Sequence, residues 1–248
     1  MAKACLRVVV TLFFCLSCHV NATVKIGTPI YDPPFVVNNP AYPIGGFDIQ
    51  LMNTICARLH WQCQYIGMRY YELLSALQAN KVDFVLGAII ITPYSQSHYL
   101  FSIPYMPSSA VFVTLKQAPF RHAKDLAGKK VGCLKGKEYF NYLEQNFVDQ
   151  LIVVPFEEPS NLIQALNSNT IDAVFMNTYT AMFFMHQYPT RVRALPEQFS
   201  LGDGIAIATT MDNREQIEQI DAVLEQILND GTFVRMYNYD FEFFIPSN

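Results

Sequence analysis

The sequence predicts an α/β protein with two similar lobes, each a mostly parallel sheet flanked by helices. Short apolar segments alternate with amphipathic ones along the chain, which is the pattern of parallel strands connected by helices. One phrase also occurs twice, as "LLSALQANKVDFVLG" at 73–87 and "LIQALNSNTIDAVFM" at 162–176. Each copy reads as a helix ending in Ala-Leu, a polar turn, an aspartate and a buried strand. A doubled α/β unit favours two lobes with a cleft between them over the alternative of one larger sheet, and ligands of such sheets bind beyond the carboxyl ends of strands.

Hydrophobic periodicity predicts the elements of the first half in order. Phe47, Leu51, Ile55 and Leu59 recur on one face of residues 46–59, which indicates an amphipathic helix. Short apolar runs bounded by turn residues indicate strands. These rules give a strand at 23–28, the helix at 46–59, a strand at 63–68, a helix at 70–80 and a strand at 82–89.

The same rhythm restarts after an apolar segment at 110–116. Each apolar run is again followed by an amphipathic stretch, so the second half repeats the alternation of the first. The expected strands lie at 129–134, 151–156, 170–176 and 204–210, and the expected helices at 137–147, 159–169 and 177–187, with one long helical segment at 214–238.

The composition is that of a globular, exported protein. Hydrophobic residues make up 51% of the 248 positions and charged residues 15%, which is enough apolar surface for a sizeable core. Residues 1–22 begin with basic residues, continue with an apolar run too short to span a bilayer and end in small residues. This pattern predicts a cleaved secretory signal, so 1–22 are excluded from the fold. The alternatives are a buried first strand and a lipid anchor on Cys15 or Cys18.

The net charge excludes a nucleic-acid-binding role. It is −4 for the whole chain and becomes −6 when the signal removes Lys3 and Arg7 and no acidic residue. A mildly acidic chain without a basic patch has no footprint for nucleic acid or for anionic lipid. We also expect no metal or other cofactor, because no remaining cysteine has metal-ligand spacing with a histidine.

Three cysteines remain after the signal. Cys56 falls late in the helix at 46–59 and Cys63 at the start of the next strand. A disulfide across this short turn would form in an oxidising compartment and stabilise the fold by about 2–3 kcal/mol. Two buried thiols are the alternative. Cys133 has no partner left and is interpreted as a buried small hydrophobe.

Seven segments of the mature chain carry a family resemblance. In order they are "KIGTPIYDPPFVV", "GGFDIQLMNTIC", "LLSALQANKVDFVLGAIIITP", "DLAGKKVGCLKG", "LIQALNSNTIDAVF", "GDGIAIA" and "ILNDGTFVRMYN". Their order and spacing resemble those of the periplasmic polar-amino-acid-binding proteins of ABC importers, solute-binding protein family 3. The similarity is greatest to the arginine and lysine/arginine/ornithine binders, and it also supports the bridge between Cys56 and Cys63.

The resemblance implies a two-lobed clam-shell. Lobe 1 would comprise 23–112 plus 205–248, and lobe 2 would comprise 117–200, with hinge strands near 111–117 and 200–206. Such a protein would close its lobes around a solute and deliver it to a separate ABC permease and ATPase. We expect a monomer.

The resemblance also maps ligand contacts onto lobe 1. Tyr70 stands where the family has an aromatic over the ligand side chain; a packed surface tyrosine is the alternative. Tyr31 and Asp32 stand at the mouth of the cleft, where Asp32 suits a cationic side chain and ordinary turn chemistry is the alternative.

The strand end "GAIIITP" stands where the family binds the ligand carboxylate. Backbone N–H groups from Gly87 and Ala88 onward open a helix there, and a helix N-terminus favours an anion. Thr92 retains its hydroxyl, whereas Ile90 replaces a common serine.

Three positions depart from the family pattern. Ser95 replaces an arginine whose planar fork takes the α-carboxylate in two hydrogen bonds. Asn177 replaces an aspartate that binds the α-ammonium, and Lys137 replaces a threonine that would face the ligand. Charge-assisted hydrogen bonds contribute about 1.5–3 kcal/mol each. The loss of two of them would weaken the binding of a free amino acid strongly, unless other residues replace them.

Three explanations follow. In the first, which we favour, the protein binds an amino acid of the basic type, with Lys137 or Arg69 replacing the lost guanidinium and Asn177 accepting from the ammonium. In the second, the scaffold binds another neutral or anionic solute with apolar surface. In the third, it is an enzyme similar to cyclohexadienyl dehydratases, with the Lys137–Glu138 pair or His98 as acid–base groups.

Overall fold

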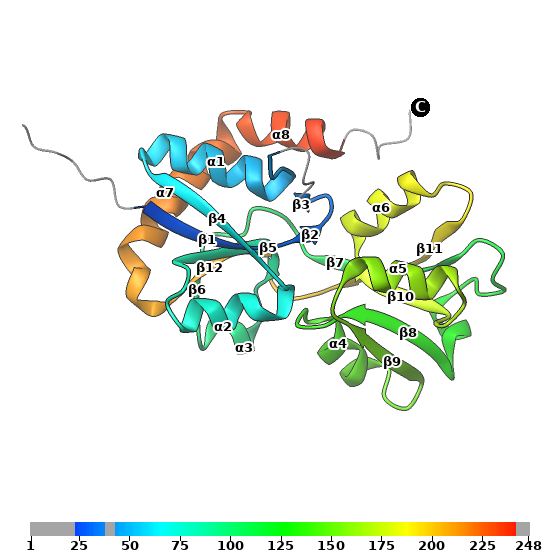
Figure 1. Cartoon of the computed structure of the whole chain (residues 1–248). Helices are drawn as coiled ribbons and strands as arrows, with labels where there is room; N and C mark the ends of the chain where they lie inside the picture. The colour runs from blue at the N-terminus through cyan, green and yellow to red at the C-terminus, as the bar shows by residue number, and fades with distance from the viewer. Residues whose placement is uncertain (1–22, 38–42, 242–248) are drawn as a thin grey trace, which may run out of the picture.

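The computed structural model describes residues 23–37 and 43–241 and has two lobes joined by two crossing segments (Figure 1). The predicted signal lies outside the described residues. Among these residues, each lobe contains one five-stranded sheet with helices packed on it. The predicted fold class, α/β with two lobes flanked by helices, is confirmed.

Lobe 1 is built from both ends of the described chain. Its sheet has the strand order β4–β1–β5–β12–β6, in which β1 runs parallel to β4 and β5 while β12 runs antiparallel to β5 and β6. The elements are β1 (Thr23–Pro29), β2 (Tyr31–Asp32), β3 (Val36–Val37), α1 (Phe47–Leu59), β4 (Gln62–Met68), a 3₁₀ turn (Tyr70–Glu72), α2 (Leu73–Gln78), β5 (Phe84–Ile90), α3 (Pro93–Gln96), β6 (Leu100–Phe101), β12 (Ile205–Thr209), a 3₁₀ turn (Met211–Asn213), α7 (Arg214–Asn229) and α8 (Thr232–Phe241).

Lobe 2 is built from one continuous segment. Its sheet has the order β11–β7–β10–β8–β9, in which β8 runs parallel to β9 and β10 while β7 runs antiparallel to β10 and β11. The elements are β7 (Ser109–Leu115), a 3₁₀ turn (Ala123–Leu126), β8 (Lys129–Leu134), α4 (Tyr139–Asn146), β9 (Leu151–Phe156), α5 (Pro159–Asn167), β10 (Ala173–Asn177), α6 (Thr178–Gln187) and β11 (Val192–Ser200).

The first crossing between the lobes lies earlier than expected. β7 begins at Ser109 and pairs with β10 and β11 along its length, so it belongs to the sheet of lobe 2. The expected boundary at 112 and hinge strand at 111–117 are therefore wrong, because the chain has already crossed before Ser109. The return crossing lies between Ser200, which ends β11, and Ile205, which begins β12.

Several short elements escape sequence analysis. The helix expected at 70–80 is a 3₁₀ turn followed by the six-residue α2. The strands β2, β3 and β6 have two residues each, too few to show a period. β11 is longer, but its burial does not alternate cleanly, and its pairing with β7 is interrupted by a bulge between Ala194 and Gln198.

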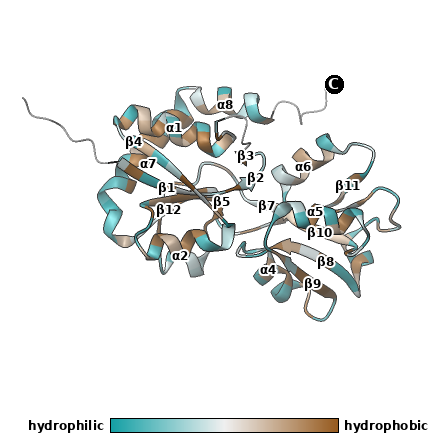
Figure 2. Ribbon diagram, in the orientation of Figure 1, coloured by the Kyte–Doolittle hydropathy of each residue, from teal (hydrophilic) through white to brown (hydrophobic). Residues whose placement is uncertain are grey.

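The core of each lobe lies on both faces of its sheet. Figure 2 shows mostly hydrophobic strands in the sheets and helices that carry both hydrophobic and hydrophilic residues. In lobe 1, α1, α7 and α8 pack on one face around Phe47, and α2 packs on the other around Leu77. In lobe 2, the neighbours Val174 and Phe175 of β10 point to opposite faces, toward α5 and α6 and toward α4. In the part of the chain that the structure describes, no helix has the length and apolarity needed to cross a membrane.

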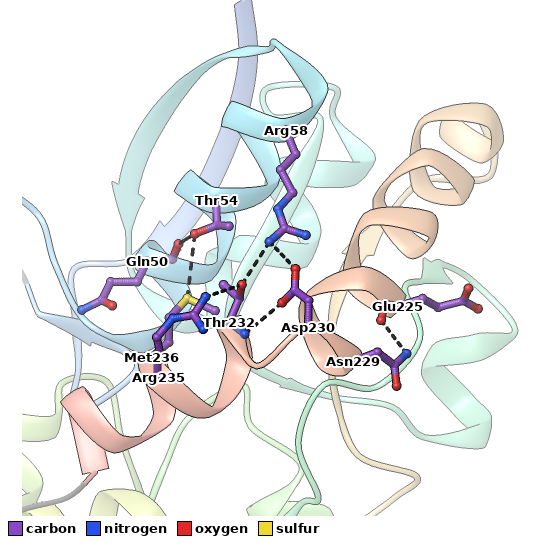
Figure 3. A network of polar contacts seen from close by, with 9 residues as sticks. All are labelled: Gln50, Thr54, Arg58, Glu225, Asn229, Asp230, Thr232, Arg235 and Met236. Atoms are coloured by element: carbon purple, nitrogen blue, oxygen red, sulfur yellow. Dashed lines mark hydrogen bonds and ion pairs between the residues drawn. The ribbon is translucent and has the colours of Figure 1, made fainter.

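A polar network ties the C-terminal helices to α1 (Figure 3). Arg58, in the last turn of α1, donates to the carboxylate of Asp230 at 2.8 Å and to the hydroxyl of Thr232 at 3.1 Å. Hydrogen bonds from Thr232 and the charge of Arg58 lower the pKa of Asp230 to about 2. The single helical segment expected at 214–238 is therefore two helices, which meet at Asp230 and at Gly231 with its φ of 79°.

The remaining cysteines are placed as predicted. Cys56 and Cys63 form a disulfide that joins the end of α1 to β4, with their Cα atoms 6.3 Å apart. His60, in the left-handed conformation, ends α1 and turns the chain between them. Cys133 is a buried free thiol. Burial raises its pKa to about 12, so the thiol stays neutral and packs as an apolar group.

Asp48 organises a bulge in β5. The register of β5 on β12 shifts around Gly87 and Ala88, and both residues take positive φ, 127° and 52°. Their amides leave the ladder and need another acceptor. The carboxylate of Asp48, in the first turn of α1, accepts from the N–H of Gly87 at 3.0 Å, from the N–H of Ala88 at 2.9 Å and from the hydroxyl of Tyr105 at 2.8 Å. Burial nevertheless raises the pKa of Asp48 to about 7.

We predict that Asp48→Asn removes a pH dependence of stability. The folded-state pKa of about 7 lies above the ordinary value of 3.8, so the folded protein keeps a proton that the unfolded chain has released. Between about pH 5 and about pH 8 this group lowers the free energy of unfolding by roughly 2–3 kcal/mol. Urea unfolding across this range should show the fall in the wild type and in the exposed control Asp212→Asn. In Asp48→Asn the fall should be smaller by roughly 2–3 kcal/mol, while Asp240, whose pKa burial raises to about 6, still contributes to it. A fall in Asp48→Asn as large as in the wild type would assign the whole titration to other groups.

Candidate functional site

A buried ion pair joins the two lobes. Asp32, in β2 of lobe 1, and Lys137, in the turn between β8 and α4 of lobe 2, meet with Nζ and Oδ2 2.7 Å apart. Their side chains are only 4% and 1% exposed. Two charges buried this deeply are stable only when they neutralise each other, so the contact fixes how the lobes face each other.

Other groups of the cleft complete a cation site around the ammonium of Lys137. The Nζ atom lies 4.4 Å from the ring centre of Tyr70 and 5.8 Å from that of Tyr139. The carbonyl oxygen of Gly87 lies 3.5 Å away. A carboxylate, a carbonyl and the face of an aromatic ring are the groups that attract a positive charge. Lobe 1 supplies all of them except Tyr139.

Burial sets the electrostatics of this site. It raises the pKa of Asp32, and the nearby ammonium of Lys137 opposes that shift. It also raises the pKa values of Tyr70 and Tyr139 well above that of free tyrosine, with the charge of Asp32 adding to the effect. The tyrosines are therefore neutral, and the carboxylate of Asp32 depends on Lys137 for its counter-charge.

A glycine brings the lysine turn against lobe 1. Gly136 has a φ of 85°, and a Cβ there would lie 2.6 Å from the Cα of Tyr71. On the rim beside this contact, the ammonium of Lys135 lies 4.5 Å from the ring centre of Tyr71. A residue with a side chain at 136 would push the two lobes apart, so glycine is required for their close approach.

A small cavity adjoins the ion pair. Its volume of about 20 Å³ is enough for one water molecule or one polar group. The Nδ2 atom of Asn177 and the hydroxyl of Thr180 line it, are buried, and have no hydrogen-bond partner within the described residues. Unpaired buried polar atoms cost free energy, so this wall of lobe 2 is suited to bind a polar group. The lining residues are Asp32, Leu134, Lys137, Tyr139, Pro159, Leu162, Met176, Asn177, Thr180 and Phe184.

Four of the predicted site residues surround this centre: Asp32, Tyr70, Gly87 and Lys137. Asn177 lies on the cavity wall, where its Oδ1 accepts from the N–H of Tyr179 at 2.8 Å and caps α6 while its Nδ2 remains available. Gly87 contributes its carbonyl rather than its amide. The amides of Gly87 and Ala88, expected to face a ligand carboxylate, donate to Asp48 instead.

The remaining predicted residues lie elsewhere. Thr92 and Ser95 form a reciprocal cap at the start of α3, where each hydroxyl accepts from the other's N–H, at 2.9 and 3.1 Å. Thr92 also borders an open groove between α3 and α4. Ile90 is buried in an apolar cluster with residues of lobe 2, and Tyr31 packs against lobe 2 beside Tyr188.

Arg69 does not replace the missing guanidinium in the cleft. Its side chain is 47% exposed and bridges to Glu157 and Glu158 of lobe 2, both at 3.3 Å. These exposed pairs add rim contacts between the lobes but contribute little stability.

The proposed acid–base groups do not form a catalytic arrangement. The ammonium of Lys137 is bound to Asp32 rather than to its neighbour Glu138. His98 is exposed, and its Nδ1 interacts with Ser97 and the carbonyl of Tyr94 in its own turn.

Sequence analysis missed four residues of the site: Asp48, Gly136, Tyr139 and Thr180. Tyr139 lies two residues after Lys137, so an aromatic residue close to a predicted ligand position was the available signal, and Asp48 was visible only as an acidic residue directly after the motif "GGF". Thr180 and Gly136 gave none, because their roles arise from contacts between distant segments.

We predict that Gly136→Ala holds the lobes apart. Gly128→Ala is the matched control, because Gly128 has a similar φ of 72° but nothing within 4 Å of its Cβ position. Both changes incur a backbone strain of about 1–2 kcal/mol, whereas only Gly136→Ala meets the opposite lobe. Small-angle scattering should give a larger radius of gyration for Gly136→Ala and the wild-type value for Gly128→Ala. Equal radii would contradict this role of Gly136.

Comparison with known proteins agrees with this architecture. The chain is 27% identical to the putative ABC transporter arginine-binding protein 2 of Escherichia coli K12, over 92% of this chain and 95% of that one. An arginine 3rd transport system periplasmic binding protein from Legionella pneumophila superposes with a TM-score of 0.83 at 30% identity, covering 88% of this chain and 99% of that one. An ancestral amino-acid-binding protein described as a precursor of cyclohexadienyl dehydratase has a TM-score of 0.80 at 22% identity, over 88% of this chain and 95% of that one, and shows the fold alone.

The Escherichia coli and Legionella relatives are both named as binding proteins. Residues 24–242 match the family model along almost the whole described chain. The chain belongs to the bacterial extracellular solute-binding proteins, family 3.

Proposed function

We propose that this protein binds an amino acid with a cationic side chain between its lobes and presents it to an ABC importer. The observation that carries the proposal is the binding of the Lys137 ammonium by Asp32 and the ring of Tyr70. These contacts support a site for a positive charge at the centre of the cleft. The Escherichia coli and Legionella relatives, both named for arginine, support the same ligand class.

The chemistry of lobe 1 suits the side chain of such a ligand. A guanidinium or ammonium would meet the carboxylate of Asp32, the ring of Tyr70 and the carbonyl of Gly87, as the ammonium of Lys137 does. An ion pair in a water-poor site and an aromatic face favour a cation over a neutral group.

The chemistry of lobe 2 suits the other end of the ligand. Lys137 can pair with an α-carboxylate once it leaves Asp32, and the hydroxyl of Thr180 and the amide of Asn177 are polar groups without partners among the described residues. These groups would take over from the family's arginine and aspartate, which are Ser95 and Asn177 here.

A second candidate ligand is a small solute that is not an α-amino acid. It is favoured by the engagement of Ser95 with Thr92 and of the Gly87 and Ala88 amides with Asp48, which leaves Lys137 as the single cation of the described residues lining the cavity. A neutral or anionic solute with apolar surface would fit Lys137, Asn177 and the apolar lining.

Export and transport partners complete the proposal. The signal-like segment 1–22, the disulfide and the periplasmic names of relatives support secretion into an oxidising compartment. A binding protein of this type moves nothing across a membrane alone, so a separate permease and ATPase would receive the solute.

We predict that a basic amino acid raises the melting temperature. The protein is purified from periplasmic extract, unfolded and refolded to remove bound solute, and melted with each amino acid, with polyamines and with organic acids. A ligand at about one hundred times its dissociation constant adds roughly 2.7 kcal/mol, which for a chain of this size raises the midpoint by about 5–10 °C. Asp32→Asn should abolish the shift with arginine or lysine.

The outcomes separate the two candidates. A shift with a basic amino acid supports the first. A shift with an organic acid or another solute, and with no amino acid, would replace it by the second. No shift with any compound would contradict both.

A further inference from the structure

We propose that Lys137 determines specificity by ion exchange. Lys137 belongs to lobe 2, and its ammonium occupies the cation site of lobe 1. A solute therefore binds only when it brings a cation for Asp32 and an anion for Lys137. This inference rests on the proposed function and restricts it to solutes that carry both charges.

The cation site has room for one positive group. Lys137 Nζ lies 2.7 Å from Asp32 and 4.4 Å from the ring centre of Tyr70, and both partners of the ion pair are almost fully buried. The adjoining cavity, of about 20 Å³, holds no more than a water-sized group. A second cation beside Lys137 would be buried against a like charge. The side chain of a bound basic solute must therefore displace the lysine.

A displaced lysine needs a new counter-ion. Asp48, the other carboxylate buried next to Gly87, already accepts three hydrogen bonds. Glu138 accepts from its neighbour Asn141 at 3.2 Å. The other groups around Lys137 are the neutral rings of Tyr70 and Tyr139 and the carbonyl of Gly87. Leaving an ammonium buried without a partner is costly, so the anion has to come from the solute.

The flexible side chain of Lys137 makes the exchange possible. Lysine is a point charge on a flexible stem of four carbons, so its ammonium can move without a change of the backbone. One buried ion pair, Asp32 with Lys137, is replaced by two: Asp32 with the solute cation, and Lys137 with the solute carboxylate. A simple amine would leave Lys137 unpaired, and a simple acid would leave Asp32 unpaired.

Lys137→Met tests the proposal. Titration calorimetry compares arginine with agmatine, and lysine with cadaverine, which keep the cation but lack the carboxylate. The wild type should bind each amino acid about 100-fold or more tighter than its amine. Lys137→Met should bind the amines tighter than the wild type does and the amino acids more weakly, so the preference falls below about tenfold. Lys135 lies two residues away in the same turn, and its side chain is 49% exposed. Lys135→Met should therefore keep the wild-type preference.

Each outcome separates this inference from the proposed function. If the wild type binds basic amino acids and Lys137→Met keeps the same preference over amines, ion exchange is overturned and the proposed function stands. If the wild type binds no amino acid but Lys137→Met gains amine binding, the lysine occupies the site as inferred and the proposed ligand class is wrong. If neither protein binds an amine or an amino acid, both fail. Lys137→Gln replaces Lys137→Met if circular dichroism shows the methionine variant unfolded.

Discussion

The ion pair between Asp32 and Lys137 is the contact on which the arrangement of the two lobes depends. The two charges come from different lobes and are both almost fully buried, so each has its counter-charge only while the lobes meet at this point. The neighbouring contacts reinforce the same geometry: Gly136 lies against the backbone of Tyr71, and Arg69 reaches across the rim. The facing of the two lobes and the charges at the centre of the cleft are therefore set by the same pair of side chains.

The cation site is anchored in the core of lobe 1 through the bulge of β5. Asp48 holds the amides of Gly87 and Ala88, and this fixes the direction of the Gly87 carbonyl toward Lys137. Glycine is needed there because a Cβ would lie 2.4 Å from the ring of Pro29. A backbone distortion that would be unfavourable inside a regular strand thus becomes part of the site, stabilised by a buried carboxylate from α1.

Much of the fold followed from local sequence patterns, whereas the site did so only in part. The strand at 129–134 and the helix at 177–187 have clear periodicity, and the structure has a strand at Lys129–Leu134 and a helix at Thr178–Gln187. The boundary at 112 failed because an apolar segment does not reveal which sheet it joins. Lys137 was identified as a departure facing the ligand, but its partner could not be, since 105 residues separate it from Asp32. Pairing over such distances is decided by tertiary packing.

The position of β12 has a consequence for how the chain folds. This strand, Ile205–Thr209, lies inside the sheet of lobe 1 between β5 and β6, although it follows all of lobe 2 in the sequence. Lobe 2 uses only nearby segments and can assemble once β11 has emerged. Lobe 1 must wait for β12, and until then β5 presents an unpaired edge beside apolar surface. We expect the earlier half of the chain to be the last to reach its native state, so nascent lobe 1 is the part most in need of a chaperone.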